Sequence, residues 1–166
     1  MIQRSNGAGE HPVAIGALAG FGLLQRDVIP MRDSSHAEID ELVAAFFGAF
    51  DNRNGRIPDH GRLARLFAEQ AVVAVHREGT CLLCTPQEFI APRIALLGSG
   101  ELTGFHEWEE SSTTQVHESL AVRTSRYAKS GFRNGSLLTG AGTKFFQFAK
   151  LPDGWKIVAL SWIDDA

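Results

Sequence analysis

The C-terminal part of the chain constrains the fold most, because it contains four segments with the composition and alternation of β-strands. The segments are residues 105–117, 120–129, 143–150 and 155–162. Turn-forming residues separate them, most clearly the Leu-Pro-Asp-Gly sequence at 151–154. Consecutive strands joined by short turns pair antiparallel, so the sequence predicts an antiparallel sheet. We expect residues 131–142, which include four glycines, to form a mobile loop between two of these strands.

Three helical patterns precede the strands. Ser35 and Glu38 have the spacing of a capping box, and apolar residues then recur three and four positions apart as far as residue 50. Thr85 and Glu88 repeat the capping-box spacing at the start of another apolar pattern. A shorter apolar pattern between these two predicts a small second helix. Helices followed by a long-stranded sheet indicate an α+β fold.

The length and charge of the chain exclude several classes of protein. Its 166 residues fit one domain. The formal net charge is -3, and a nucleic-acid partner would usually require a basic surface. Basic and acidic residues are interleaved, so we expect no membrane-binding patch, and two cysteines make no disulfide framework. We therefore predict a cytoplasmic protein that binds neither nucleic acid nor membrane.

Residues 1–33 differ from the rest of the chain. They include an apolar run at 13–24 that is shorter than the roughly 20 residues a membrane-spanning helix needs. The run has the length of a signal-peptide core, but the residues after it do not form a cleavage site. Three interpretations remain open: a start codon placed too early or a disordered arm, a secretory signal, and an ordered extra element. We therefore separate an N-terminal extension, 1–33, from a folded domain, 34–166.

The order of the predicted elements and several short stretches resemble the nuclear transport factor 2-like superfamily, and within it the SnoaL-like domains of bacteria. The matching stretches are residues 49–53, 89–93, 105–109, 125–131 and 154–162. The resemblance implies a cone-shaped α+β barrel, in which a strongly curved antiparallel sheet wraps around three helices. It also implies a pocket inside the cone and a homodimer through the outer face of the sheet. Members include enzymes and binding modules, so the resemblance does not assign an activity.

A tight turn at residues 118–119 would place Arg123 opposite Thr114 and Tyr127 opposite Glu110. The residues alone leave open which face of the sheet points inward. The resemblance implies that the face carrying Arg123 and Tyr127 points into the cone. Arg123 offers a planar, permanently charged fork for a carboxylate, and Glu110 would hold it in place or act as a base. The alternative is a cross-strand ion pair and hydrogen-bond ladder with no ligand.

The candidate site residues have two predicted roles. The ligand-binding candidates are Arg123, Tyr127, Glu110, Trp108, Ser125 and Trp162, and the catalytic candidates are Glu110, Tyr127 and His106. The histidines lack the spacing of a metal motif, so we expect no metal, and no pattern indicates a cofactor. We interpret Asp51 as part of a helix stop and Lys144 as a solvated lysine.

The function predicted on this basis is a domain that binds a small molecule in the cone. Its ligand would be apolar with one acidic or carbonyl group. One alternative is a cofactor-independent isomerase, dehydratase or other lyase, or hydrolase that uses acid–base catalysis in the same pocket. Another is a protein-interaction module, which would have a filled core and an exposed apolar patch. The residues that line the cavity should distinguish these functions.

Overall fold

A computed structural model describes residues 34–77 and 79–165, and our predictions for 1–33 therefore lie outside the described residues. The helices are α1 (Ser34–Gly48), the 3-10 turn η1 (Arg53–Gly55), α2 (His60–Ala64) and α3 (Pro86–Gly98). The strands are β1 (Phe67–Arg77), β2 (Thr80–Cys84), β3 (Leu102–His117), β4 (Leu120–Arg133), β5 (Ser136–Leu151) and β6 (Gly154–Asp164).

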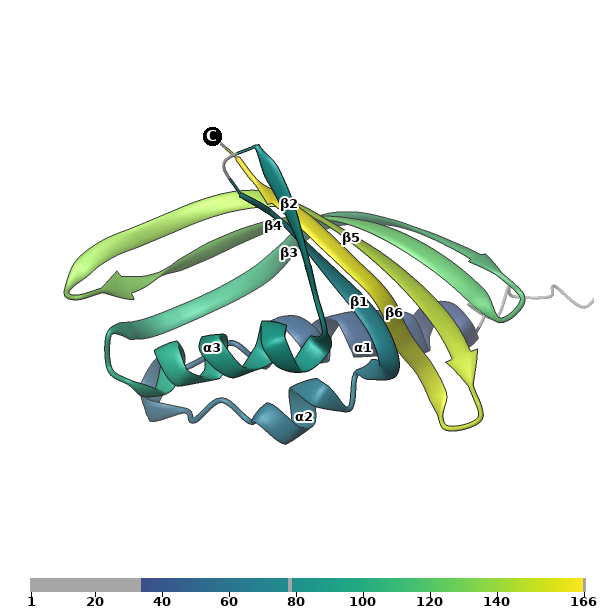
Figure 1. The fold of residues 1–166 in the computed structure, drawn as a ribbon, viewed down its shortest axis with the longest axis horizontal. Coiled ribbons are helices and arrows are strands. Elements are labelled where there is room, and N and C mark those ends of the chain that lie inside the picture. Colours follow the sequence, from purple (N-terminus) through teal and green to yellow (C-terminus); the bar gives the residue numbers. More distant parts are fainter. Residues whose placement is uncertain (1–33, 78, 166) are drawn as a thin grey trace, which may run out of the picture.

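The six strands form one curved sheet in the order β2-β1-β6-β5-β4-β3. All neighbouring pairs are antiparallel except β1 and β6, which run parallel. Figure 1 shows the sheet arching over the helices, with α1 and α3 lying against its concave side. The predicted α+β cone is confirmed, with one parallel pair that the strand pattern did not indicate.

Local sequence signals explain where the helices begin. Thr85 accepts a hydrogen bond from the Glu88 backbone N–H, and the Glu88 side chain accepts one from the Thr85 N–H, as predicted. Asp59 caps the short α2 by accepting from the Arg62 N–H at 3.0 Å. The first helix begins at Ser34, so Ser35 lies inside it rather than at its cap.

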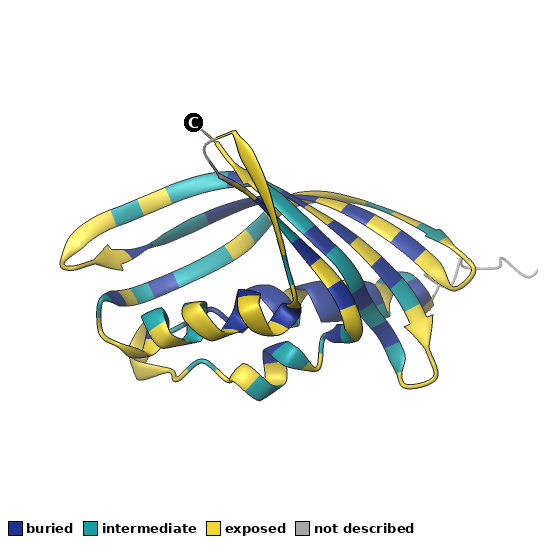
Figure 2. Cartoon of the chain, in the orientation of Figure 1, coloured by how far each residue is buried: buried dark blue, intermediate teal, exposed yellow. Residues whose placement is uncertain are grey.

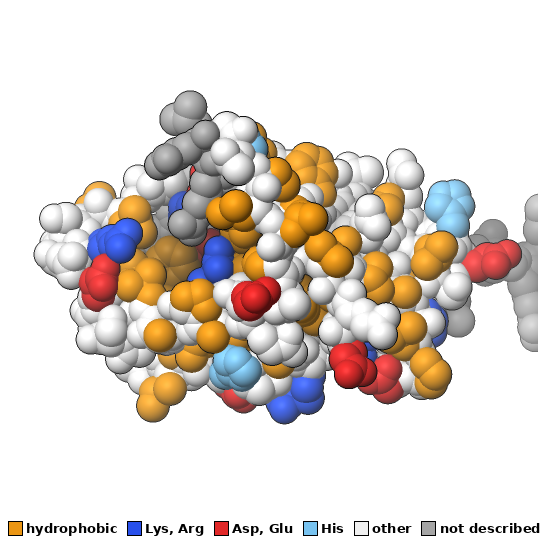
Figure 3. Space-filling model, in the orientation of Figure 1, with side chains coloured by type: hydrophobic (Ala, Val, Ile, Leu, Met, Phe, Trp, Pro, Cys, Tyr) orange, Lys and Arg blue, Asp and Glu red, His pale blue; other side chains and the backbone are white. Residues whose placement is uncertain are grey.

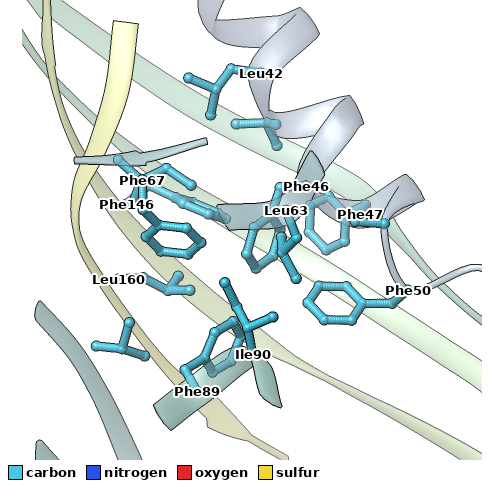
Figure 4. Packing of buried hydrophobic residues seen from close by; sticks show 14 of the residues in the cluster. Leu42, Phe46, Phe47, Phe50, Leu63, Phe67, Phe89, Ile90, Phe146 and Leu160 are labelled. Atoms are coloured by element: carbon cyan, nitrogen blue, oxygen red, sulfur yellow. The ribbon is translucent and has the colours of Figure 1, made fainter. Parts of the chain in front are cut away.

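Aromatic side chains fill the space between the helices and the sheet. Phe46 of α1 lies at the centre of this cluster and packs edge-on against Phe146 of β5, with ring centroids 5.2 Å apart. The Phe89 ring of α3 lies nearly parallel to that of Phe46, with ring centroids 6.4 Å apart (Figure 4). Buried positions alternate with exposed or half-buried ones along β5 and β6, as expected for strands with one face against a core (Figure 2). The core therefore occupies only the concave side of the sheet.

The predicted loop at residues 131–142 is wrong, because these residues form a β-hairpin. Strands β4 and β5 stay paired from Leu120↔Ala149 to Arg133↔Ser136, and a two-residue turn at Asn134 joins them. Asn134 and Gly135 both have positive φ, which is the backbone of the tight turns that connect antiparallel strands. Of the four glycines we took as loop signals, Gly135 lies in this turn, and Gly131, Gly140 and Gly142 lie inside the strands. In the strands a Cβ at any of these three positions would clash with a residue of a neighbouring strand.

The convex face of the sheet carries several large apolar side chains that are exposed in the single chain. They include Val72, Val122, Phe145 and Ile163. The homodimer through this face stays a prediction. Within the described residues, no helix is both long and apolar enough to span a membrane.

Candidate functional site

A cavity of about 480 Å³ opens between α3 and the concave face of the sheet. Figure 3 shows a hollow left of centre with hydrophobic side chains inside it and Lys or Arg side chains beside it. Its walls come from α1, α3 and five of the strands, so residues far apart in the sequence meet there. The side chains that matter for its chemistry are Phe89, Arg93, Glu107, Tyr127, Lys129, Lys144, Trp162 and Asp164.

Lys144 is the buried cation of this cavity, although we predicted a solvated lysine. Its position on β5 follows the same alternation as Phe146, so its side chain points to the concave side and only 4% of the residue is exposed. Its Nζ lies 3.2 Å from Glu107 Oε2 and 3.5 Å from the centre of the Tyr127 ring. Burial lowers the pKa of the Lys144 ammonium, and the attraction of Glu107 offsets this only in part.

Tyr127 reaches the cavity because the residue beside it on β5 is a glycine. A Cβ at Gly142 would lie 2.8 Å from the Tyr127 hydroxyl and 2.4 Å from the backbone oxygen of Ile163. Tyr127 lies across this gap and donates a hydrogen bond to Asp164, which is paired with Gly142 on β6. Burial, together with the nearby Asp164 carboxylate, raises the pKa of Tyr127, so the phenol stays protonated.

Asp164 joins two strands at the cavity wall. It accepts hydrogen bonds from Tyr127 and from Lys129 Nζ, the latter at 2.7 Å. Burial alone would raise the pKa of this carboxyl, but these two hydrogen bonds lower it overall. Asp164 is therefore an anion that accepts from two donors, whereas Glu107 pairs with Lys144.

The wall of the cavity next to Lys144 is aromatic. Trp162 of β6 and Phe89 of α3 meet with ring centroids 5.4 Å apart. The guanidinium of Arg93 lies over the Phe89 ring at 4.0 Å and over Trp162 at 5.1 Å. Arg93 also donates to the Phe89 backbone oxygen at 2.8 Å. A planar apolar group would therefore find aromatic faces on this side.

The charged side chains of the cavity carry an excess of positive charge. Four Lys or Arg side chains, at 93, 129, 133 and 144, line it together with only Glu107 and Asp164. The formal excess among the lining residues is two positive charges, and it falls to one when Glu101, which pairs with Arg133 at 2.9 Å from outside the lining, is counted. A concave site with one sign of charge attracts the opposite sign. Electrostatics therefore favour an anionic occupant.

A second hollow, also of about 480 Å³, lies between η1 and the turn after α3. It is lined mainly by loop and turn residues, among them Ile57, which is 89% exposed. None of its lining residues is a buried charged side chain. We therefore place the candidate site in the cavity that holds Lys144.

Arg123 does not line that cavity, although we named it the principal ligand contact. It is buried against α1, where Nη1 donates to Asp40 at 2.6 Å and to Thr114 at 2.8 Å. Its Nε and Nη2 both donate to Glu109. Burial alone would lower the pKa of Arg123, but the hydrogen bonds to Glu109 and Asp40 raise it overall. Arg123 therefore belongs to a hydrogen-bond network that joins Glu109 and Thr114 of β3 to Asp40 of α1.

We predicted that Glu110 lies opposite Tyr127. This pairing is wrong, because a β-bulge shifts the register. The predicted pairs Thr114↔Arg123 and Ser112↔Ser125 are confirmed, but the register shifts between Glu109 and Ser111. Beyond the bulge it is Glu109 that lies opposite Tyr127. Glu110 is exposed, so it neither lines the cavity nor contacts Arg123.

The other candidate residues divide into two groups. Tyr127 and Trp162 line the cavity, as expected of ligand contacts. Ser125 is fully buried and donates to Glu109 in the Arg123 cluster. Trp108 is 39% exposed and stacks on His106, with ring centroids 4.7 Å apart, and neither residue lines the cavity. These last three placements do not favour a role in the cavity.

Asp51 has the turn role that we expected. It accepts from the Arg53 backbone N–H at 3.0 Å and pairs with the guanidinium groups of Arg53 and Arg56. The hydrogen bonds from Arg53 lower the pKa of this carboxyl to about 2. In the part of the chain that the structure describes, no three His, Cys, Asp or Glu side chains are placed to hold a metal ion.

Sequence reasoning missed Glu107, Lys144 and Asp164 as site residues. A signal for Lys144 was present, because it continues the every-second-residue pattern of Phe146 and Phe148 toward the concave face. No comparable signal existed for Glu107, since its distance from Lys144 depends on the order of strands in the sheet. The same holds for Asp164.

Comparison with known proteins supports the fold and no more specific assignment. The chain matches no protein-family profile and no curated protein. Among solved structures it is similar to a nuclear transport factor 2-like superfamily protein from Salmonella enterica, with 16% identity and a TM-score of 0.66 over 80% of this chain and 92% of that one.

Two further structures extend this likeness. One is a nuclear transport factor 2-like protein with a cystatin-like fold from Novosphingobium aromaticivorans, with 18% identity, a TM-score of 0.58 and coverage of 78% of this chain and 80% of that one. The other is a type 2 hexachlorocyclohexane dehydrochlorinase, with 14% identity, a TM-score of 0.66 and coverage of 80% and 86%. The chain therefore has the cystatin-like α+β fold of the nuclear transport factor 2-like proteins.

Proposed function

We propose that the protein binds a small organic molecule with a flat apolar body and one acidic or carbonyl group. The observation that carries this proposal is the buried ammonium of Lys144, which lines an aromatic-walled cavity and has one carboxylate, Glu107, within 4 Å. An ammonium has three donors, so an oxygen of a ligand would find donors still available. A largely apolar cavity with a few polar anchors is the usual form of a small-molecule site.

The excess of positive charge in the cavity supports an acidic ligand in particular. Arg93 is held over Phe89 and Trp162, and a flat ligand beside these rings would lie near its charge. The cavity volume of about 480 Å³ lies within the roughly 300–1,000 Å³ of ligand pockets. An open cavity of this kind favours a small-molecule site over a pure protein-interaction module.

The proposal is tested with para-methylbenzoate, an aromatic acid, and para-methylbenzamide, its uncharged analogue. We expect the acid to bind more tightly than the amide and to change the intrinsic tryptophan fluorescence, because Trp162, one of three tryptophans, lines the cavity. Lys144→Met should weaken binding of the acid by about tenfold or more, since a hydrogen bond to a charged group contributes about 1.5–3 kcal/mol.

Lys150→Met is the matched control, because Lys150 is 41% exposed and pairs with Glu38 away from the cavity. It should leave the affinity unchanged. Equal binding of acid and amide, or equal effects of the two lysine substitutions, would refute the proposed role of Lys144.

One observation favours a second function, acid–base catalysis without a cofactor. Glu107 and Lys144 lie 3.2 Å apart inside the cavity, so a proton could pass between a ligand and this pair. In that case the protein should speed the exchange of a C–H proton next to the carbonyl of acetophenone in deuterated water, measured by NMR. Glu107→Gln should abolish the acceleration. An exchange rate equal to that of buffer would contradict catalysis and leave the binding proposal intact.

A further inference from the structure

Two lysines line the cavity, and their surroundings differ. The side chain of Lys129 is 21% exposed and its Nζ pairs with Asp164 at 2.7 Å. That of Lys144 is 5% exposed, and its Nζ is surrounded by aromatic rings. The centroids of Tyr127, Trp162 and Phe47 lie 3.5, 5.6 and 5.7 Å from it. Lys144 is thus an amine held in an apolar cage that opens onto a cavity.

We propose that Lys144 Nζ condenses with the carbonyl group of an aldehyde or ketone in the cavity and forms an imine there. This inference rests on the proposed function, because the carbonyl compound must first bind. It goes further by assigning a covalent step to one atom. It also narrows the ligand class to molecules in which the polar group at Lys144 is a carbonyl.

Glu107 completes the chemistry of this step. The Lys144 ammonium transfers one proton to Glu107, which lies 3.2 Å away, and becomes a neutral amine. The amine nitrogen attacks the carbonyl carbon, and its proton passes to the carbonyl oxygen to give a carbinolamine. Glu107 returns its proton to the hydroxyl group, which leaves as water, and an iminium ion forms. One ammonium and one carbonyl compound have become one iminium ion and one water molecule, with no change in charge.

The surroundings of Lys144 favour both the first and the last step of this reaction. Burial lowers the pKa of the ammonium, and each unit of lowering raises the fraction of neutral amine near neutral pH about tenfold. Lys129 acts in the same direction, while Glu107 and Asp164 oppose it. The ring face of Tyr127 lies against the amine, and its hydroxyl, which donates to Asp164, stays protonated. The iminium product is again a cation beside Glu107 and the Tyr127 ring, so it gains the contacts that the ammonium had.

The experiment uses the full chain with para-carboxybenzaldehyde, which combines an aldehyde with an acidic group. Sodium cyanoborohydride reduces each imine to a stable amine, and peptide mapping by mass spectrometry locates the label. We expect Lys144 to be labelled first, ahead of the more exposed Lys129, Lys150 and Lys156. Added para-methylbenzoate, which lacks the aldehyde, should slow labelling at Lys144 and leave Lys150 and Lys156, which do not line the cavity, unchanged. In guanidinium chloride, which unfolds the chain, the preference for Lys144 should disappear.

A second variant tests the role of Glu107. Glu107→Gln should slow the labelling of Lys144 and leave the labelling of Lys150 unchanged. Labelling that follows exposure, with Lys144 last, would overturn the inference. If para-methylbenzoate still binds in the cavity in that case, the imine step alone has failed and the proposed function remains. If it does not bind, both have failed.

Discussion

Two buried cations on the concave face of the sheet have opposite surroundings. Arg123 donates to two carboxylates and a hydroxyl, and these hydrogen bonds raise its pKa. Lys144 is paired with one carboxylate and surrounded by aromatic rings, and burial lowers its pKa. Each is less than a tenth exposed, so burial by itself does not distinguish them. The number of anionic partners distinguishes them. Arg123 has two and joins α1 to the sheet, whereas Lys144 has one and keeps donors available.

The largest expected effect comes from removing the better-paired cation. Arg123→Met leaves Glu109 without its guanidinium, and breaking a buried pair in this way costs about 3–5 kcal/mol. Lys144→Met removes a cation that burial disfavours, so it should cost less. Unfolding in urea, monitored by circular dichroism, measures both losses. A loss for Lys144→Met equal to or greater than that for Arg123→Met would break the comparison.

A smaller effect tests which glutamate belongs to the Arg123 cluster. Glu109→Gln weakens charge-assisted hydrogen bonds from Arg123 and Ser125, and we expect it to lower the free energy of unfolding by about 1.5–3 kcal/mol. Glu110→Gln changes an exposed side chain and should stay within about 0.5 kcal/mol of the original protein. Urea unfolding of both variants gives the comparison. The reverse order would show that the bulge is absent in solution.

The smallest effect is a difference in pH dependence. The folded-state pKa of Lys144 lies below its usual value of 10.5, so between these two values the unfolded chain binds more protons than the folded one. The contribution of Lys144 to stability should therefore rise as the pH rises through this window. We expect the free energy of unfolding of the original protein to increase relative to that of Lys144→Met as the pH rises from neutral toward 10.5. A constant or shrinking difference would contradict the lowered pKa, and Lys150→Met serves as control.

The errors of sequence-based prediction have particular physical causes. The hairpin of β3 and β4 was predicted correctly from its turn as far as Ser112↔Ser125, because pairing close to a turn depends on the turn alone. One extra residue at the bulge then shifted the register, so that Glu109 rather than Glu110 lies opposite Tyr127. The glycines after residue 130 were taken for a loop because glycine is common in turns. Only Gly135 lies in a turn, whereas Gly131, Gly140 and Gly142 are positions in the sheet across which longer side chains lie.

The sequence by itself determined the helices, the curved sheet and the existence of a concave core. These follow from caps, turns and the spacing of apolar residues, which act over a few residues. Only the tertiary structure decided which buried cation keeps hydrogen-bond donors available. Glu107, Lys144 and Asp164 lie on three different strands, and the strand order β6-β5-β4-β3 sets the distances between them. The pKa of a buried group depends on those distances, which a local pattern does not contain.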